Sequence, residues 1–305
     1  MRFTKMQGAG NDYVYVNCFE EDVESPPELA RRISDRHFGV GSDGLILIRP
    51  TLDGRADCRM EMYNADGSRA QMCGNGIRCV AKYAYEHGIA GHPKITIETD
   101  AGVKTVLAHA GSSGEIVDVE VDMGSPQFTR AEIPMTGGGN PAEPAMNVPI
   151  EVKGRRLHLT AVSMGNPHAV IRLPVPPEGP PLSEWPVAEV GSAIERHPWF
   201  PERVNTEFAA FRSRCEMDLR VWERGSGETL ACGTGACAAV VAGVLNGWCD
   251  RRVLVHLRGG DLRIRWEGAS QESRPHGGTV YMTGPAVEVF TGEWPDGSHP
   301  AAPRP

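Results

Sequence analysis

The sequence lacks the marks of several protein classes. No apolar run reaches the ~20 residues that a membrane-spanning helix needs. None of the eight cysteines forms a Cys-x-x-Cys pair, which disfavours a disulfide oxidoreductase and a zinc site. The Gly-x4-Gly-Lys-Ser/Thr motif of nucleotide-binding P-loops is absent. Lysine is scarce, with five residues against 26 arginines, so there are few candidates for Schiff-base chemistry.

Positive charge is in the minority. Lys and Arg number 31 against 39 Asp and Glu, which gives a net charge of −8. This balance disfavours binding to nucleic acid or to an anionic membrane surface. The first residues, Met1–Met6, do not form the apolar segment of a signal peptide, so we expect a cytoplasmic protein with reduced cysteines. A length of 305 residues suggests about two domains.

The hydrophobic pattern predicts many strands and few helices, which favours an α+β fold over a doubly wound sheet. One helix is predicted over Pro27–His37, with Leu29, Ala30 and Ile33 on its apolar side. Residues 136–149 and 174–181 are rich in Gly and Pro and are predicted loops, and residues 293–305 are a predicted disordered tail. The predicted strands are Val14–Val16, Leu45–Ile48, Ile95–Thr99, Lys104–Ala108, Ile116–Val121, Leu157–Val162, Ala169–Leu173, Glu207–Phe211, Met217–Trp222, Val253–Leu257, Leu262–Trp266, Thr279–Met282 and Ala286–Phe290.

An internal repeat is the most informative feature. The segment Tyr63–Gly88 matches Trp222–Gly247 at an offset of 159 residues, which aligns Cys73 with Cys232. In both copies an aromatic residue ends a strand, a Cys-Gly-x-Gly turn follows, and an apolar helical stripe runs to a glycine that fits a helix C-terminus. A second, weaker match aligns the Gly-Asn dipeptides at residues 10–11 and 165–166. Two copies of one supersecondary unit predict two similar domains.

The repeat puts each of these cysteines at the start of a helix. Free backbone N–H groups and the helix dipole at this position favour a thiolate and lower the thiol pKa from its usual ~8.5 toward neutrality. The same N–H groups can hold a carboxylate. Two opposed thiols can therefore remove a Cα proton from one face and return one to the other. The other cysteines are interpreted as structural: Cys18, Cys58, Cys79, Cys215, Cys237 and Cys249.

Six motifs together resemble the diaminopimelate epimerase family. The clearest reads Asn-Ala-Asp-Gly-Ser from Asn64, then four residues, then Cys-Gly-Asn-Gly-Ile-Arg from Cys73. The resemblance extends to about Phe290 and implies a cofactor-independent and metal-independent epimerase that interconverts LL- and meso-2,6-diaminopimelate in lysine and peptidoglycan precursor biosynthesis. It also implies a homodimer. The other five motifs are KMQGAGNDY at Lys5–Tyr13, GVGSDGLI at Gly39–Ile46, SMGNPHAV at Ser163–Val170, VNTEF at Val204–Phe208 and VWERGSGETLACGTGA at Val221–Ala236.

The resemblance also implies roles for individual residues. Cys73 and Cys232 match the two proton-transfer residues, and His168 and Glu223 match positions that support catalysis beside them. The chemistry of the distal end of the substrate agrees, because an arginine can pair with its carboxylate and a glutamate with its ammonium. The residues that match substrate contacts are Asn11, Asn64, Gly74, Asn75, Asn166, Asn205, Glu223, Arg224, Gly233 and Thr234. Gly44 stands where some members of the family carry a contacting Gln, so this glutamine contact is not assigned to the sequence.

The implied fold has two pseudo-symmetric domains, each with β-strands wrapped around a central α-helix. We place the first domain at residues 1–125, joined by returning strands at 279–292, and the second at 126–278. Three other functions stay open. A proline or hydroxyproline racemase usually has His where Asn75 stands, and an isomerase of the phenazine-biosynthesis type lacks the cysteine pair. A non-catalytic amino-acid-binding protein would bind the ligand without exchanging its Cα proton.

Overall fold

The computed structural model describes residues 1–51, 53–267 and 278–295. Its contacts divide the chain into two compact units. The first holds Met1–Val121 and the chain from Gly284 onward, and the second holds Asp122–Thr283. Within the described ranges, no helix is both long and apolar enough to cross a membrane. All eight cysteines are free thiols.

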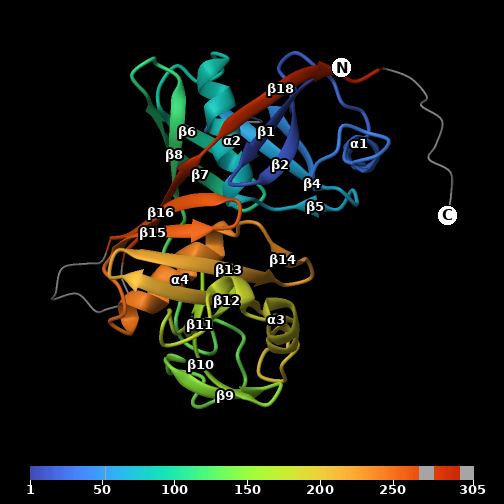
Figure 1. The fold of residues 1–305 in the computed structure, drawn as a ribbon. Coiled ribbons are helices and arrows are strands. Elements are labelled where there is room, and N and C mark those ends of the chain that lie inside the picture. The colour runs from blue at the N-terminus through green and yellow to red at the C-terminus, as the bar shows by residue number, and fades with distance from the viewer. Residues whose placement is uncertain (52, 268–277, 296–305) are drawn as a thin grey trace. The chain divides into compact units, whose positions relative to one another are not determined.

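The first unit consists of strands paired around one helix (Figure 1). Strand β1 is antiparallel to β2 and β18, β2 is parallel to β3, and β3 is antiparallel to β4. Strand β4 is antiparallel to β5 and parallel to β6, and β6, β7 and β8 form an antiparallel meander. The elements are β1 (Arg2–Gly8), β2 (Asn11–Asn17), α1 (Pro26–Ile33), β3 (Gly44–Arg49), β4 (Cys58–Asn64), β5 (Arg69–Ala70), α2 (Gly74–Glu86), β6 (Lys94–Thr99), β7 (Gly102–Ala110), β8 (Ile116–Asp122) and β18 (Val287–Glu293).

Helix α2 is the centre of this unit. It contacts β1, β2, β4, β6 and β7, and its residues 75–84 are all buried. Ile77, Val80, Ala81 and Ala84 form the apolar stripe of this helix, and the polar residues Asn75, Arg78 and Lys82 are buried on it as well. The shorter α1 contacts β3 and β4 and buries Ala30 and Ile33, as its apolar side predicts.

The second unit repeats this topology. Strand β10 is antiparallel to β9 and β11, β11 is parallel to β12, and β12 is antiparallel to β13. Strand β13 is antiparallel to β14 and parallel to β15, and β15, β16 and β17 form the second meander. The elements are β9 (Val148–Val152), β10 (Arg155–Ser163), β11 (Pro167–Leu173), η1 (Leu182–Glu184), α3 (Val187–Glu195), β12 (Asn205–Ser213), β13 (Glu216–Glu223), β14 (Gly227–Thr229), α4 (Gly233–Leu245), β15 (Arg252–Leu257), β16 (Gly260–Trp266) and β17 (Val280–Pro285).

Helix α4 takes the central place in the second unit. It lies among the strands of this unit (Figure 1) and contacts β10, β11, β12 and β16, and the sequence makes most of its side chains small. Its bounds, Gly233–Leu245, equal those of α2 shifted by the 159 residues of the sequence repeat. The predicted α+β class, with two similar domains built around central helices, is therefore confirmed.

Several details differ from the sequence prediction. The helix predicted over Pro27–His37 is α1, which ends already at Ile33. Helix α3, the short helix η1 and strands β5, β9 and β14 were not predicted, and β9 begins inside the predicted loop 136–149. At the C-terminus, β18 pairs through Glu293, and the backbone N–H of Trp294 donates to the Met1 carbonyl oxygen at 2.8 Å. The expected disordered tail therefore begins too early at residue 293, and its residues 296–305 lie outside the described residues.

Candidate active site

Each of the two aligned cysteines is the N-cap residue of a central helix. Cys73 caps α2 with extended backbone angles, φ −131° and ψ 122°. Cys232 caps α4 with nearly the same angles, φ −121° and ψ 111°. The predicted position at a helix start is thus confirmed for both. Because the first N–H groups of a helix have no partner within the helix, both sulfurs lie next to donors that can bind an anion.

The thiol of Cys73 lies against Asn11 at the start of β2. Its Sγ donates to Asn11 Oδ1 at 3.3 Å and accepts from the Gly76 backbone N–H at 3.4 Å. On its other side, Asn11 Nδ2 donates to Asp43 Oδ2 at 2.8 Å. Asp43 thus determines which end of the amide faces the sulfur, because a carboxylate can only accept.

Asp43 belongs to a charged cluster at the edge of the first unit. Arg36 forms ion pairs with Asp12 at 2.8 Å and with Asp43 at 3.0 Å, and Lys5 pairs with Asp12 at 2.5 Å. Burial works to raise the pKa of Asp12, but hydrogen bonds from Arg36 and Lys5 outweigh it and lower that pKa. Burial and the neighbouring Asp12 charge raise the pKa of Asp43. The cluster fixes the loop that carries Asn11.

The first turn of α2 is held by a buried arginine. Arg78 Nη1 donates to the Gly74 carbonyl oxygen at 3.2 Å and to Asn75 Oδ1 at 2.9 Å. Its Nε donates to the Pro285 carbonyl oxygen at 3.1 Å. Arg78 had no predicted role, although it is part of the Cys-Gly-Asn-Gly-Ile-Arg motif. These contacts fix the turn whose backbone N–H groups are the predicted carboxylate cradle.

Asn64 and Gly44 lie side by side where β4 ends and β3 begins. They face each other in the strand register, and the Ala65 N–H donates to the Asp43 carbonyl oxygen at 3.0 Å. A Cβ on Gly44 would lie only 3.1 Å from Asn64 Cα, which leaves no room for a longer side chain in this backbone. Asn64 Nδ2 donates to Ser68 Oγ at 3.0 Å. Asn64 is therefore close to the Asn11 and Asp43 pair.

The thiol of Cys232 is more deeply buried than that of Cys73, with 5% of the residue exposed. Its Sγ lies 3.5 Å from Thr234 Oγ1. Burial raises the pKa of Cys232 well above its usual value, and the charges of Glu223 and Glu207 add to the rise. The Thr234 hydroxyl and the Gly235 N–H act in the opposite direction. The expectation that a helix start lowers this thiol pKa toward neutrality is therefore wrong for this structure, because burial and two carboxylates outweigh the helix.

A buried polar chain leads to Thr234 from β11 and β12. His168 and Glu207 are both fully buried, and His168 Nδ1 lies 2.7 Å from Glu207 Oε1. His168 Nε2 lies 2.9 Å from Asn166 Oδ1, and Asn166 Nδ2 donates to Thr234 Oγ1 at 3.3 Å. Burial raises the pKa of Glu207, against the effect of the nearby His168. The sequence analysis missed Glu207 as a site residue, although it lies in the VNTEF motif.

The remaining predicted residues gather on the same side of the second unit. Asn205 Oδ1 accepts from the Arg224 backbone N–H at 2.8 Å, and Asn205 Nδ2 donates to the Pro167 carbonyl oxygen at 3.0 Å. Glu223 Oε1 accepts from the Thr229 hydroxyl at 2.5 Å. The exposed Arg224 guanidinium donates to the Glu202 carbonyl oxygen at 3.0 Å.

Each unit thus assembles its own share of the predicted site. The first unit collects Asn11, Asn64, Cys73, Gly74 and Asn75, and the second collects Asn166, His168, Asn205, Glu223, Arg224, Cys232, Gly233 and Thr234. In the part of the chain that the structure describes, no group of three or more His, Cys, Asp or Glu is arranged to hold a metal ion. The expected independence from cofactors stays a prediction.

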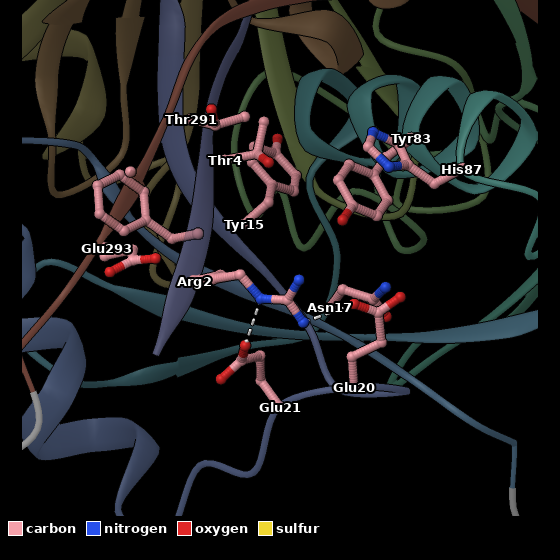
Figure 2. A pocket seen from close by; sticks show the side chains of 12 residues that line it. Arg2, Thr4, Tyr15, Asn17, Glu20, Glu21, Tyr83, His87, Thr291 and Glu293 are labelled. Atoms are coloured by element: carbon pink, nitrogen blue, oxygen red, sulfur yellow. Dashed lines mark hydrogen bonds and ion pairs between the residues drawn. The ribbon is translucent and has the colours of Figure 1, made fainter.

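A separate pocket of about 360 Å³ lies on the first unit, away from these residues. Figure 2 shows its polar lining, in which Arg2 faces Glu21 and Glu20, while Tyr83 comes from α2 and His87 is the C-cap of that helix. The rings of Tyr83 and His87 stack at 3.8 Å between centroids. None of the predicted site residues lines this pocket, so its shape gives no information about the cysteines.

Comparison with known proteins extends these observations. Residues 3–129 and 160–289 match the family model described as diaminopimelate epimerase. A diaminopimelate epimerase of Desulfovibrio desulfuricans is 52% identical over 297 residues, covering 96% of this chain and 98% of the relative. One of Leptospira biflexa is 48% identical over 293 residues, with coverage of 96% and 98%.

Solved structures share the fold at low sequence identity. A probable proline racemase from Agrobacterium radiobacter superposes with a TM-score of 0.66 at 16% identity, covering 96% of this chain and 92% of the other. A phenazine biosynthesis protein of the PhzF family from Bacillus anthracis also gives 0.66 at 16% identity, with coverage of 97% and 99%. At this identity the likeness describes the fold alone.

Proposed function

The chain belongs to the diaminopimelate epimerase family, and we propose that it interconverts LL- and meso-2,6-diaminopimelate by proton transfer between Cys73, Cys232 and one substrate Cα. It is an isomerase of the epimerase type. The observation that carries the proposed mechanism is the paired geometry: each unit presents one thiol as the N-cap of a central buried helix.

The proposed reaction needs two proton transfers. A thiolate at Cys232 takes the Cα proton and becomes a thiol, and the bonding electrons stay on the substrate as a carbanion. The thiol of Cys73 then gives its proton to the opposite face of Cα and becomes the thiolate. The stereocentre is inverted, and the two cysteines exchange roles in the reverse direction. For this to occur both sulfurs must approach the same Cα when substrate is bound.

The carbanion must be stabilised without a cofactor. Its charge spreads onto the neighbouring carboxylate, and free N–H groups at two helix starts can bind that carboxylate. We assign this role to the backbone of Gly74–Asn75 and Gly233–Thr234. Arg78 supports the first turn through its bonds to Gly74 and Asn75.

The unreactive end of the substrate is also an amino acid. Arg224 is exposed on the second unit and can turn from the Glu202 carbonyl to a substrate carboxylate, with which it forms two parallel bonds. Glu223 can accept the ammonium group. The asparagines at 11, 64, 166 and 205 provide both donors and acceptors for the same groups.

Binding of the substrate would also help to activate Cys232. The Glu223 carboxylate is one of the charges that raise the pKa of this thiol, after burial. A substrate ammonium beside Glu223 would offset that charge and lower the thiol pKa. The base would then form mainly when diaminopimelate is present.

The proposal also covers the cofactor requirement, the location, the pathway and the oligomeric state of the enzyme. We propose that the enzyme needs no cofactor, acts in the cytoplasm, and serves lysine and peptidoglycan precursor biosynthesis. We also propose a homodimer, which is supported by exposed apolar side chains on β18: Val287, Val289 and Phe290 are 41%, 53% and 45% exposed. Light scattering after gel filtration would give the mass of one chain if the dimer proposal is wrong.

The decisive experiment follows Cα hydrogen exchange by proton NMR in D2O, without pyridoxal phosphate or added metal. LL-diaminopimelate should gain deuterium at one Cα while the meso isomer appears. Cys73→Ala and Cys232→Ala should lose epimerisation, whereas Cys215→Ala, an exposed cysteine outside the site, should keep it. Normal turnover in either active-site variant would reject the two-base mechanism. Exchange with proline or hydroxyproline instead would change the substrate assignment.

A further inference from the structure

An unbroken polar chain runs from a buried carboxylate to Cys232. It passes from Glu207 through His168, Asn166 and Thr234, with successive distances of 2.7, 2.9, 3.3 and 3.5 Å. Glu207 begins the chain at a position where 0% of the residue is exposed. Among the residues that the structure describes, its second oxygen, Oε2, is buried without a hydrogen-bond partner. Burying a carboxylate without a partner is costly in free energy, and the ring of His168 is the partner that offsets this cost for Glu207.

The equivalent amides of the two units point in opposite directions. In the first unit, Asn11 Nδ2 donates to Asp43, so the amide oxygen faces Cys73 and accepts from its thiol. In the second unit, the Asn166 oxygen faces His168, so the amide nitrogen faces Thr234. The residue behind each asparagine therefore decides which end of the amide serves the cysteine.

The direction in the second unit depends on one proton. Asn166 Oδ1 can only accept, so Nε2 of His168 must carry a hydrogen. Glu207 favours this state when its carboxyl carries a proton, because the carboxyl then donates to Nδ1 and the ring keeps its hydrogen on Nε2. Burial, which raises the pKa of Glu207, favours the protonated carboxyl.

The amide direction in turn determines what Thr234 can do. Its hydroxyl has one hydrogen to donate. Because Oγ1 accepts from Asn166, that hydrogen is free to point at the Cys232 sulfur, 3.5 Å away. If the amide were reversed, the Thr234 hydrogen would be drawn to the amide oxygen and the sulfur would lose a donor.

We propose that Glu207 is a positioning residue for Cys232: through His168 and Asn166 it holds the Thr234 hydroxyl as a hydrogen-bond donor to the sulfur. This deepens the proposed function, on which it rests, by naming a group that stabilises the thiolate form of the base. Glu207 does not touch the reacting atoms in this account. Gly235 permits the arrangement, because a Cβ there would lie 2.9 Å from Glu207 Oε1 and 3.3 Å from the sulfur.

The proposal can be tested by whether removal of Glu207 makes the Cys232 thiolate easier or harder to form. Two carboxylates act on the sulfur, Glu207 from β12 and Glu223 from β13, and His168 faces Glu207 from β11. If Glu207 acted only through its charge, its removal would make the thiolate easier to form. If it acts through Thr234, its removal takes a hydrogen bond from the thiolate and makes it harder to form.

The experiment measures the rate of alkylation of Cys232 by iodoacetamide against pH, resolved from the other cysteines by peptide mass spectrometry. It compares Glu207→Leu with the parent and repeats the pair in a Thr234→Val background. In the parent background, Glu207→Leu should raise the pH midpoint by about one unit, which slows alkylation about tenfold below the midpoint. In the Thr234→Val background it should cause no rise. In a Thr234→Ser background, which keeps the hydroxyl, Glu207→Leu should raise the midpoint as it does in the parent.

Thr206→Val is the matched control, since Thr206 is buried on the same strand but its side chain points to the other face. It should leave the midpoint unchanged. A fall or no change with Glu207→Leu in the parent background overturns the proposal, and so does a rise in both backgrounds. The alkylation readout does not need turnover, so the deuterium-exchange result tests the proposed function separately.

A second measurement uses the unaltered protein and so does not depend on the folding of a variant. Nitrogen-15 NMR of the histidine rings, with His168 assigned through His168→Gln, reports which ring nitrogen carries hydrogen. The proposal requires a protonated Nε2 across the pH range of activity. An unprotonated Nε2 that accepts from the Asn166 amide would overturn it.

Discussion

The end of β13 at Glu223 and the loop that follows it with Arg224 are anchored by a buried glutamate at the end of α3. Glu195 Oε2 accepts from Trp222 Nε1 at 2.8 Å, and its Oε1 accepts from the Gly225 backbone N–H at 3.0 Å. Glu195 is 2% exposed, so water cannot replace these contacts. We therefore predict that Glu195→Gln destabilises the second unit and weakens substrate binding together.

The magnitude follows from the two hydrogen bonds. A hydrogen bond to a charged group contributes about 1.5–3 kcal/mol, and a neutral one about 1 kcal/mol. A glutamine keeps one acceptor, so it can serve Trp222 or Gly225 but must turn an N–H group toward the other donor. The expected loss is about 2 kcal/mol. For a unit of this size, that loss lowers the melting temperature by about 4–8 °C.

The pH dependence gives an independent check on the same contacts. Burial works to raise the pKa of Glu195, but hydrogen bonds from Trp222 and Gly225 outweigh it and lower that pKa below its usual 4.5. A carboxyl whose folded pKa is depressed stabilises the protein above its unfolded pKa, and this contribution is lost as pH falls through the folded value. The difference in melting temperature between parent and Glu195→Gln should therefore be constant above about pH 5.5 and shrink below pH 4.5.

The assay combines thermal unfolding with steady-state kinetics. Glu189→Gln is the control, because Glu189 is an exposed acid on the same helix and its replacement should change stability by less than about 0.5 kcal/mol. Glu195→Gln should also raise KM for diaminopimelate more than it lowers kcat, since the displaced loop carries the proposed contacts to the unreactive end. If Glu195→Gln and Glu189→Gln behave alike in both assays, the anchoring argument is refuted.

Two further predictions concern packing and a buried cation. Gly191→Ala should lower the melting temperature, because the added Cβ would lie 2.6 Å from Trp222 Cβ. This clash outweighs the ~1 kcal/mol that replacing a helical glycine gains. A higher melting temperature would contradict the prediction. Lys82→Met should destabilise by about 1–3 kcal/mol with kcat unchanged, because Nζ donates to Glu86 at 2.8 Å and to the Ile116 carbonyl oxygen at 2.6 Å. Calorimetry beside an epimerase assay checks both, and a lower kcat in Lys82→Met would contradict the second prediction.

The strong local patterns were enough to predict most of the fold. Each predicted strand segment lies within or overlaps an observed strand, and the Cys-Gly-x-Gly repeat located both central helices. Helix α3 was missed because its apolar positions at 187, 190 and 194 are interrupted by Gly191 and follow a stretch rich in proline. A short helix of this kind is stabilised by packing against β12 and β13, which no local pattern encodes.

Membership of a motif was not enough to predict every residue of the candidate site. Glu207 lies in the VNTEF motif but was not predicted, because a period-two strand pattern does not mark it as buried and polar. It is separated from His168 by 39 residues, and only the parallel pairing of β11 with β12 brings the two side chains together. The raised pKa of Cys232 has the same origin, since the burial and the two carboxylates that cause it come from different strands. Such effects are properties of the tertiary structure.

The repeat itself predicted the backbone better than it predicted the chemistry. Positions 75 and 78 in α2 align with 234 and 237 in α4, yet the first pair is Asn75 with a buried Arg78 and the second is Thr234 with Cys237. Asn75 accepts from Arg78 and so is turned toward its own helix, whereas the Thr234 hydroxyl lies against the sulfur. Two nearly identical helix starts therefore place their thiols in different polar surroundings. The proposed reaction needs one cysteine as thiolate and the other as thiol, and side chains at equivalent positions can bias which cysteine holds the proton without any change of backbone.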